Sequence, residues 1–190
     1  MQSVLIVSSN EKTAELVMPL INDMYPGSTV TVCASAKDAR RMDMEFDLVI
    51  INSPLRDEPG AELAMEIVKK SAAGCLMITK ADNADEMSDK LSELGVMVLE
   101  RPISKKMFAS SVRLINAARK RFMGTLKENE KLHRELGEIK MINRAKLVLM
   151  KYLKFSEQQA HRYIEKQSMD LRMSKYDIAL KVVKTYDLDA

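Results

Sequence analysis

The stretch "DLVIINSPLRDEPG", from Asp47 to Gly60, decides the fold. Four consecutive apolar residues lead into Asn52, and a polar loop that begins with Ser53-Pro54 and ends in Gly60 follows. An apolar run of this length, closed by turn residues, is typical of a strand buried on both faces of a sheet. Such a strand carries Asn52 to its carboxyl end, which raises the question of what a neutral amide does there.

The rest of the first 105 residues repeats this alternation of apolar runs with amphipathic segments. Strands are expected at residues 4–8, 28–35, 47–52, 74–79 and 95–102, and helices at residues 11–23, 36–45, 60–72 and 83–94. This alternation, with strands that are apolar throughout, predicts a parallel sheet with helices on both faces. Ligands of such sheets bind at the carboxyl ends of the strands. The side chains expected at those ends are Ser8, Ser9, Asn52, Thr79 and Arg101.

Residues 1–120 resemble the receiver domain of response regulators, an α/β flavodoxin-like (CheY-like) fold. In that family the first strand ends in a pair of acids that bind magnesium, and this sequence has Ser8 and Ser9 there. The third strand of the family ends in the aspartate that accepts the phosphoryl group, and Asn52 takes its place. The family's Thr or Ser after the fourth strand is kept as Thr79. Its Lys before a proline on the fifth strand is Arg101 in this sequence.

These departures remove the groups on which phosphoryl transfer depends. A carboxylate must attack phosphorus, and Mg²⁺ needs hard anionic oxygens. Hydroxyl and amide groups are neutral, and Arg presents a planar fork where Lys presents a compact ammonium. We therefore expect a pseudo-receiver without metal or cofactor, which is not phosphorylated and is controlled by partner binding or oligomerisation. Asp57, in the following loop, is the alternative acceptor. Alternatively, Thr79 and Arg101 only fill a remnant pocket.

A long helix is expected after Pro102, because no further proline occurs. A heptad pattern fits residues 108–143, which we expect to form a coiled-coil linker. Its a positions are Ile115, Phe122, Asn129, Leu136 and Asn143, and its d positions are Ala118, Thr125, Leu132 and Ile139. The pattern predicts a parallel homodimer in which paired Asn129 side chains set the register. Because Gly124 and Gly137 weaken the helix, the alternative is a helix packed against its own domains.

Residues 130–190 predict a small three-helix bundle at the end of the long helix. The first helix is expected to end near Leu153, and Ser156 and Ser174 each have the spacing to an acidic or amide residue that starts a helix. Short loops between the helices imply compact packing. The expected core residues are Ala145, Leu149, Ala160, Ile164, Met169, Ile178 and Ala179.

This segment resembles the ANTAR family, the RNA-binding transcription antitermination regulators. The residues that carry the likeness are Ile142, Ala145-Lys146, Leu147 in the place of a glycine, Leu149-Met150, Glu157, Ala160, Ser168-Met169, Lys175 and Ala179. The likeness covers about 55 residues and follows a receiver-like domain and a coiled coil, as in that family. It implies a dimer that binds two hairpins of a nascent mRNA leader and prevents a terminator hairpin from forming.

The charge distribution agrees with a polyanionic partner for the second half only. Residues 1–105 hold 11 Lys and Arg against 17 Asp and Glu, whereas residues 106–190 hold 19 against 10. Cations neutralise phosphates, and unpaired loop bases offer rings for stacking. The candidate RNA-binding cations are Arg144, Lys146, Lys151, Lys154, Arg162, Arg172 and Lys175, of which Lys146, Arg172 and Lys175 are favoured. Tyr152, Tyr163 and Tyr176 either stack on bases or pack within the bundle.

Other classes of protein fit the sequence less well. Cys33 and Cys75 lack metal-site spacing and are expected to be buried free thiols in a reducing cytoplasm. No signal peptide or apolar run of about 18 residues is present, so we expect a cytoplasmic protein without membrane contact. No nucleophile–base pair or phosphate loop suggests an enzyme. The open alternatives are a DNA-binding response regulator, and a protein-only adaptor whose pseudo-receiver docks a sensor or inhibitor protein.

Overall fold

A computed structural model describes residues 1–43 and 45–186, which form two compact units divided between Gly124 and Thr125. The first unit is built on a five-stranded parallel sheet with the strand order β2-β1-β3-β4-β5. The strands are β1 Ser3–Ser8, β2 Thr29–Cys33, β3 Leu48–Asn52, β4 Gly74–Lys80 and β5 Val96–Arg101. The expected flavodoxin-like receiver fold is confirmed.

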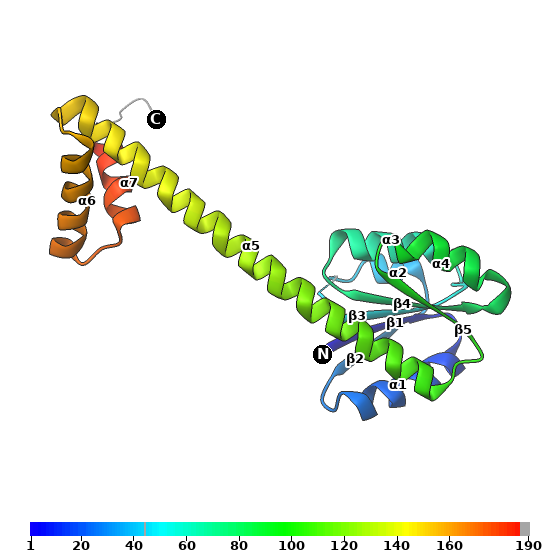
Figure 1. Cartoon of the computed structure of the whole chain (residues 1–190). Helices are drawn as coiled ribbons and strands as arrows, with labels where there is room; N and C mark the ends of the chain where they lie inside the picture. The colour runs from blue at the N-terminus through cyan, green and yellow to red at the C-terminus, as the bar shows by residue number, and fades with distance from the viewer. Residues whose placement is uncertain (44, 187–190) are drawn as a thin grey trace. The chain divides into compact units, whose positions relative to one another are not determined.

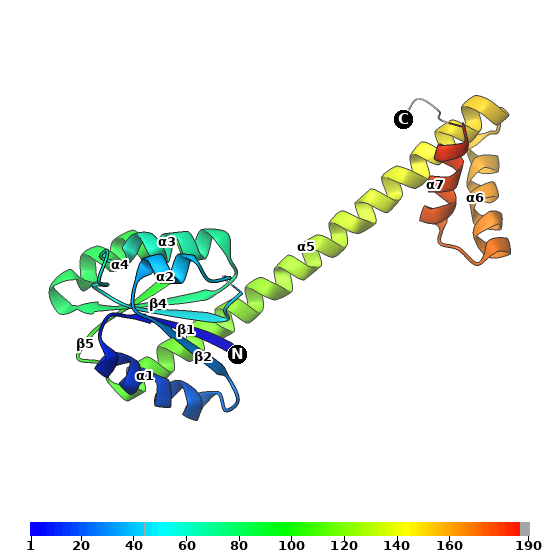
Figure 2. The same ribbon diagram turned by 180° about the vertical axis from the view of Figure 1, so that it is seen from behind.

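Helices cover both faces of this sheet (Figures 1 and 2). They are α1 Glu11–Met24, α2 Ala36–Arg40, α3 Ala61–Lys70, α4 Ala84–Ser92, which follows the short η1 Ala81–Asn83, and α5 Lys105–Leu153. α2, α3 and α4 lie on one face, and α1 and the beginning of α5 lie on the other. The helix expected at residues 36–45 is shorter than predicted, because the chain turns after Arg40 and brings Met42 and Phe46 back onto the core.

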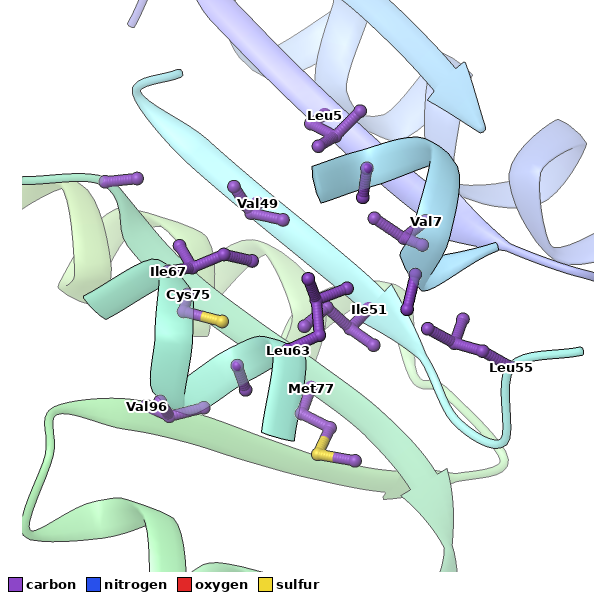
Figure 3. Close-up of a cluster of buried hydrophobic side chains, with 14 of the residues drawn as sticks. Leu5, Val7, Val49, Ile51, Leu55, Leu63, Ile67, Cys75, Met77 and Val96 are labelled. Carbon is purple, nitrogen blue, oxygen red and sulfur yellow. The ribbon is translucent and has the colours of Figure 1, made fainter. Parts of the chain in front are cut away.

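Each face of the sheet has its own apolar core. Under α2, α3 and α4, side chains such as Val49, Ile51 and Leu63 interlock (Figure 3). Cys33 and Cys75 are buried in this core as free thiols, as expected. Burial raises the pKa of Cys33 to about 11 and that of Cys75 to about 12, so both thiols stay protonated at neutral pH.

The second unit contains the C-terminal part of α5 with α6 Glu157–Leu171 and α7 Lys175–Tyr186. Ser156 and Gln159 form a complete capping box at α6, and the Ser174 hydroxyl accepts the Asp177 N–H at the start of α7. α5 ends at Leu153 as predicted. The three-helix bundle expected after the receiver-like domain is therefore present, and none of the described helices is long and apolar enough to cross a membrane.

One predicted core residue of the bundle, Met169, is wrong, because its side chain is 78% exposed. Ala160 and Ile164 set the buried stripe of α6, and the next position on that stripe is 168. Ser168 fills it, and its hydroxyl donates to the Met173 carbonyl at 2.6 Å. The other six predicted core residues of the bundle are buried.

The beginning of α5 packs firmly onto the sheet. Phe108, Val112 and Ile115 are buried in the core beneath it, and Ile115 is only 7% exposed. Ile115 was predicted to face a partner helix in a coiled coil. That assignment is wrong, because a side chain enclosed by its own domain cannot insert between residues of a second helix. The first large exposed apolar residue of the heptad is Phe122, which is 53% exposed and follows the small exposed Ala118.

A clamp made of Asp47 and Arg119 fixes this part of α5 to the amino end of β3. The Asp47 carboxylate pairs with the Arg119 guanidinium at 2.6 Å and accepts the backbone N–H groups of Gln2 and Ser3. Arg119 Nε donates to the Ala72 carbonyl at 3.0 Å. Burial raises the pKa of Asp47, but the two N–H groups and Arg119 together lower it by more than burial raises it. The pKa of Asp47 therefore lies below its ordinary value of 3.8.

Replacing Asp47 with Asn is expected to lower the free energy of unfolding by about 1–3 kcal/mol at pH 7, because charge-assisted hydrogen bonds are lost. The pKa is lower in the folded state, so this stabilisation is complete above pH 3.8 and is lost as the pH falls through the folded-state pKa. Urea unfolding at pH 7 and pH 3 should therefore give a smaller difference at pH 3. The exposed Asp43→Asn variant is the control. An equal difference at both pH values would contradict the charge-based account.

Candidate receiver site and nucleic-acid interface

The carboxyl ends of β1, β3 and β4 bring Ser8, Asn52 and Thr79 into the interior, where each is at most 5% exposed. Ser8 and Asn52 are register partners on adjacent strands. The Asn52 Nδ2 donates to the Ser8 Oγ at 2.9 Å, and that hydroxyl donates to the Asn10 carbonyl at 2.8 Å. A neutral hydrogen-bonded chain thus occupies the end of the sheet where the receiver family has acids.

Two other predicted site residues contribute less directly. The Ser9 hydroxyl donates to the Ala34 carbonyl at 2.9 Å and lies on the exposed side of the loop, so Ser8 and Ser9 do not act as a pair. The Arg101 guanidinium donates to the Ser53 carbonyl, next to Asn52. The Ser53–Pro54 and Arg101–Pro102 peptide bonds are both cis.

The donor set of this site does not fit the Mg²⁺ of receiver domains. Ser8, Asn52 and Thr79 offer hydroxyl and amide oxygens, whereas Mg²⁺ is held in proteins by carboxylates together with water and phosphate. Among residues 1–43 and 45–186, no three His, Cys, Asp or Glu side chains lie close enough together to hold a metal. The buried Asn52 Oδ1 lacks a partner in the described chain, but a single neutral oxygen does not replace an acidic cluster.

Asp57, the alternative phosphoacceptor, has a structural role. Its carboxylate accepts the backbone N–H groups of Lys37 at 2.9 Å and Ala36 at 3.0 Å, and so caps the start of α2. These hydrogen bonds from Lys37 and Ala36 lower the pKa of Asp57. The Asp57 carboxylate hydrogen-bonds to the start of α2 and is not part of the buried Ser8–Asn52 hydrogen-bonded chain.

Incubation of the protein with acetyl phosphate and Mg²⁺ is expected to add no phosphoryl group, because an amide oxygen is a poor nucleophile and the Mg²⁺ ligands are missing. Intact-mass spectrometry checks this result. The Asp57→Asn variant, measured in parallel, distinguishes the sites. Phosphorylation that persists in this variant and maps to Asn52 would refute the pseudo-receiver interpretation, and phosphorylation lost in it would assign the acceptor role to Asp57.

A groove of about 790 Å³ lies elsewhere in the first unit, at the amino ends of β4 and β5. The ends of α3 and α4 and one side of α5 line it, mostly with apolar side chains that include Leu94, Leu114 and Phe122. It is separate from the strand ends that hold Ser8 and Asn52. The sequence pattern alone gave no sign of it.

The second unit pairs two of the three favoured RNA-binding cations with its own carboxylates. Lys146 Nζ lies 3.0 Å from Glu157, and the Lys146 side chain is only 16% exposed. Lys175 Nζ lies 2.6 Å from Glu165, which His161 also approaches at 3.3 Å. Lys175, followed by His161, lowers the pKa of Glu165. The partners in these two ion pairs lie 10 or 11 positions apart, on different helices. No local spacing rule predicts such pairs from the sequence.

The other five candidate cations lie at the surface of the second unit. Arg144, Lys151, Lys154, Arg162 and Arg172 are exposed. Lys154 and Arg172 have positive φ values of 57° and 51° and follow the ends of α5 and α6. Arg162 also lines a hollow of about 390 Å³ with Lys146, Glu157, Gln158, His161 and Glu165. The acids in this hollow oppose phosphate binding, so the exposed cations outside it are better placed.

The tyrosines of the bundle differ in accessibility. Tyr163 is half-buried against Phe155, with ring centroids 5.9 Å apart, and Tyr176 is also half-buried. Tyr152 is 43% exposed and stacks on Tyr186, with ring centroids 6.2 Å apart and an interplanar angle of 26°. The sequence alone does not indicate the role of Tyr186, since 34 positions separate it from Tyr152.

Comparisons with known proteins agree with both units. Residues 130–183 match the family described as ANTAR domain. No curated protein sequence matches the chain. Among solved structures, a response regulator receiver domain protein from Clostridium thermocellum is 16% identical with a TM-score of 0.56, over 64% of this chain and 99% of the other. The signal receiver domain of a putative LuxO repressor protein from Vibrio parahaemolyticus is 22% identical with a TM-score of 0.56, over 67% and 97%.

The non-phosphorylated HemR receiver domain from Leptospira biflexa is 24% identical with a TM-score of 0.53, over 61% of this chain and 94% of the other. At these identities the structural matches establish the fold of the first unit and nothing about its chemistry. Residues 130–183 therefore match the ANTAR domain, and the chain joins this region to an N-terminal unit with the fold of receiver domains.

Proposed function

We propose that the protein is a non-enzymatic, RNA-binding regulator of transcription antitermination that acts as a cytoplasmic homodimer. The ANTAR domain at residues 130–183 is the observation that carries this proposal. In the proposed action, the two ANTAR domains of a dimer each bind one hairpin of a nascent mRNA leader. The bound RNA then does not form the terminator hairpin, and polymerase continues.

The charge of the second half supports a contact with RNA. Residues 106–190 carry a net charge of +9, and the exposed cations Lys151, Lys154, Arg162 and Arg172 can neutralise phosphates. Arg144, Lys146 and Lys175 complete the proposed RNA-binding set. The ion pairs of Lys146 and Lys175 make these two residues the weaker members.

An exposed apolar stripe on α5 supports the homodimer. Phe122, Leu132, Leu136 and Ile139 are each more than half exposed, and Asn129 lies between them in the heptad. Large apolar side chains that recur on one face of a solvated helix gain free energy when a second helix covers them. The proposed seam begins at Phe122, since Ile115 belongs to the receiver core.

We further propose that different parts of the chain have different functions. Residues 1–120 receive a signal, residues 108–143 hold the dimer, and residues 130–190 bind RNA. Because the Ser8–Asn52 site has no acid, the signal is contact with a sensor or inhibitor protein, or a change of oligomeric state, in place of phosphorylation.

Filter binding with two-hairpin RNAs against duplex DNA of equal charge tests this function. We expect unlabelled two-hairpin RNA to displace bound, labelled RNA far better than duplex DNA does. Single-stranded loops expose bases that a duplex keeps stacked. Preferential binding of the duplex would favour a DNA-binding regulator. Absence of any salt-dependent binding to either would favour a protein-only adaptor.

A further inference from the structure

The corner between α5 and α6 carries an aromatic surface that the proposed function leaves unassigned. Tyr152 lies in the last turn of α5, which ends at Leu153, and Lys154 turns the chain toward α6 with a φ of 57°. Tyr186, from the end of α7, stacks on the Tyr152 ring. The backing ring holds Tyr152 in place while 43% of that residue faces solvent.

Tyr152 is also the accessible tyrosine of this protein. All five tyrosines lie in the described part of the chain, and Tyr25, Tyr163, Tyr176 and Tyr186 are each only partly exposed. An aromatic ring that faces solvent is not fully buried. A flat ligand that stacks on it removes the ring from water, which is favourable. Tyr152 is therefore suited to stacking on a planar ring from outside the protein.

Two lysines add positive charge at the same corner. Lys151 Nζ lies over the Tyr152 ring, 4.9 Å from its centre, and a base that stacks there takes the place of this flexible side chain, whose ammonium then reaches a phosphate. Lys154 follows the end of the helix. Among the described residues neither lysine forms an ion pair within 4.0 Å, whereas Lys146 and Lys175 do. An exposed aromatic ring flanked by unpaired ammonium groups is the arrangement with which proteins hold single-stranded nucleic acid: the ring stacks on a base and the cations contact phosphates.

We propose that Tyr152, backed by Tyr186, stacks on an unpaired base of the bound RNA, and that Lys151 and Lys154 contact the phosphates beside that base. This assignment rests on the proposed RNA-binding function and deepens it. Lys146 and Lys175 tie α6 to α5 and α7 through Glu157 and Glu165, so they contribute less to RNA binding than Lys151 and Lys154. A base locked in a duplex has no free face, so the site selects a hairpin loop over a stem.

The test uses the full chain and a pool of two-hairpin RNAs with randomised loops, from which the RNAs that bind the wild type are isolated. Tyr152→Leu is expected to weaken binding of such an RNA about ten-fold, because base–aromatic stacking is lost. Tyr152→Phe, which keeps the ring, should bind as the wild type does. The Lys151→Ala, Lys154→Ala double variant should lower the salt slope by about 1.4, from about 0.7 for each phosphate contact to a single strand.

Photocrosslinking gives a readout that does not depend on a variant's folding. RNA with 5-iodouridine at each loop position in turn should crosslink the wild-type protein at Tyr152. Tyr163→Phe is the matched control, because Tyr163 packs on Phe155, and it should leave binding unchanged. Equal RNA affinity of Tyr152→Leu and the wild type, or loop crosslinks that avoid Tyr152, would overturn the assignment. Failure of the wild type to bind any RNA of the pool would instead overturn the proposed function itself.

Discussion

Replacing Leu132 and Leu136 with lysine is expected to convert the proposed dimer to a monomer. Both side chains are 53% exposed in the single chain, so neither substitution removes core packing. In a parallel coiled coil they would face each other across the seam, and four ammonium groups would have to be buried there. Loss of the dimer should weaken binding of a two-hairpin RNA about 10²-fold or more, because the second hairpin no longer binds at high effective concentration.

Size-exclusion chromatography with light scattering measures the first effect, and filter binding with two-hairpin and one-hairpin RNAs measures the second. Leu147→Lys is the matched control for oligomeric state, since Leu147 is 64% exposed but lies off the a and d positions. A double lysine variant that remains dimeric would show that the two chains associate through another surface.

Replacing Gly74 with Ala is expected to destabilise the first unit by about 1–3 kcal/mol, the usual effect of overpacking. A Cβ atom at Gly74 would overlap the Cγ2 of Ile115, and the Asp47 carbonyl oxygen lies on another side at 3.6 Å. Ile115 is buried between α5 and the sheet, so it has little room to move. Urea unfolding of the full chain, followed by circular dichroism, measures the loss.

Two further variants sharpen this test. Gly124→Ala is the matched control, because nothing lies within 4 Å of a Cβ there, and it should stabilise α5 by up to about 1 kcal/mol. Ile115→Ala removes the overlapping methyl group, so adding it to Gly74→Ala should cost less than the sum of the single changes. Strictly additive losses would mean that α5 does not pack on Gly74 in solution.

Sequence reasoning predicted the receiver-like unit well, because its strands are set by local pattern. The apolar run before Asn52 indicated a buried strand, and the alternation of strands with helices indicated a parallel sheet. The order of the strands followed from the resemblance to receiver domains. Ser8 and Asn52 could be placed together for the same reason, since the carboxyl ends of adjacent parallel strands meet. That their side chains hydrogen-bond to each other could not be read from the sequence.

The incorrect predictions concern residues whose hydrophobic character fits more than one kind of packing. Ile115 satisfies a heptad, but the same helical face begins by covering the sheet, and only the three-dimensional packing shows where α5 leaves its own core. Met169 lies one position beyond the buried stripe of α6. Because methionine is hydrophobic, the sequence suggested that it was buried. Lys146, Lys175 and Tyr186 depend on contacts between helices, and their partners Glu157, Glu165 and Tyr152 are fixed by the fold of the bundle.

We expect the protein to bind RNA without being phosphorylated. A salt titration of the purified, unmodified full chain with the pool of two-hairpin RNAs tests this directly. We expect tight binding at low salt, with an affinity that falls steeply and log-linearly as salt rises, because cations of the ANTAR domain displace counterions. No binding at any salt concentration, by folded full-length protein and by residues 125–190 alone, would contradict it.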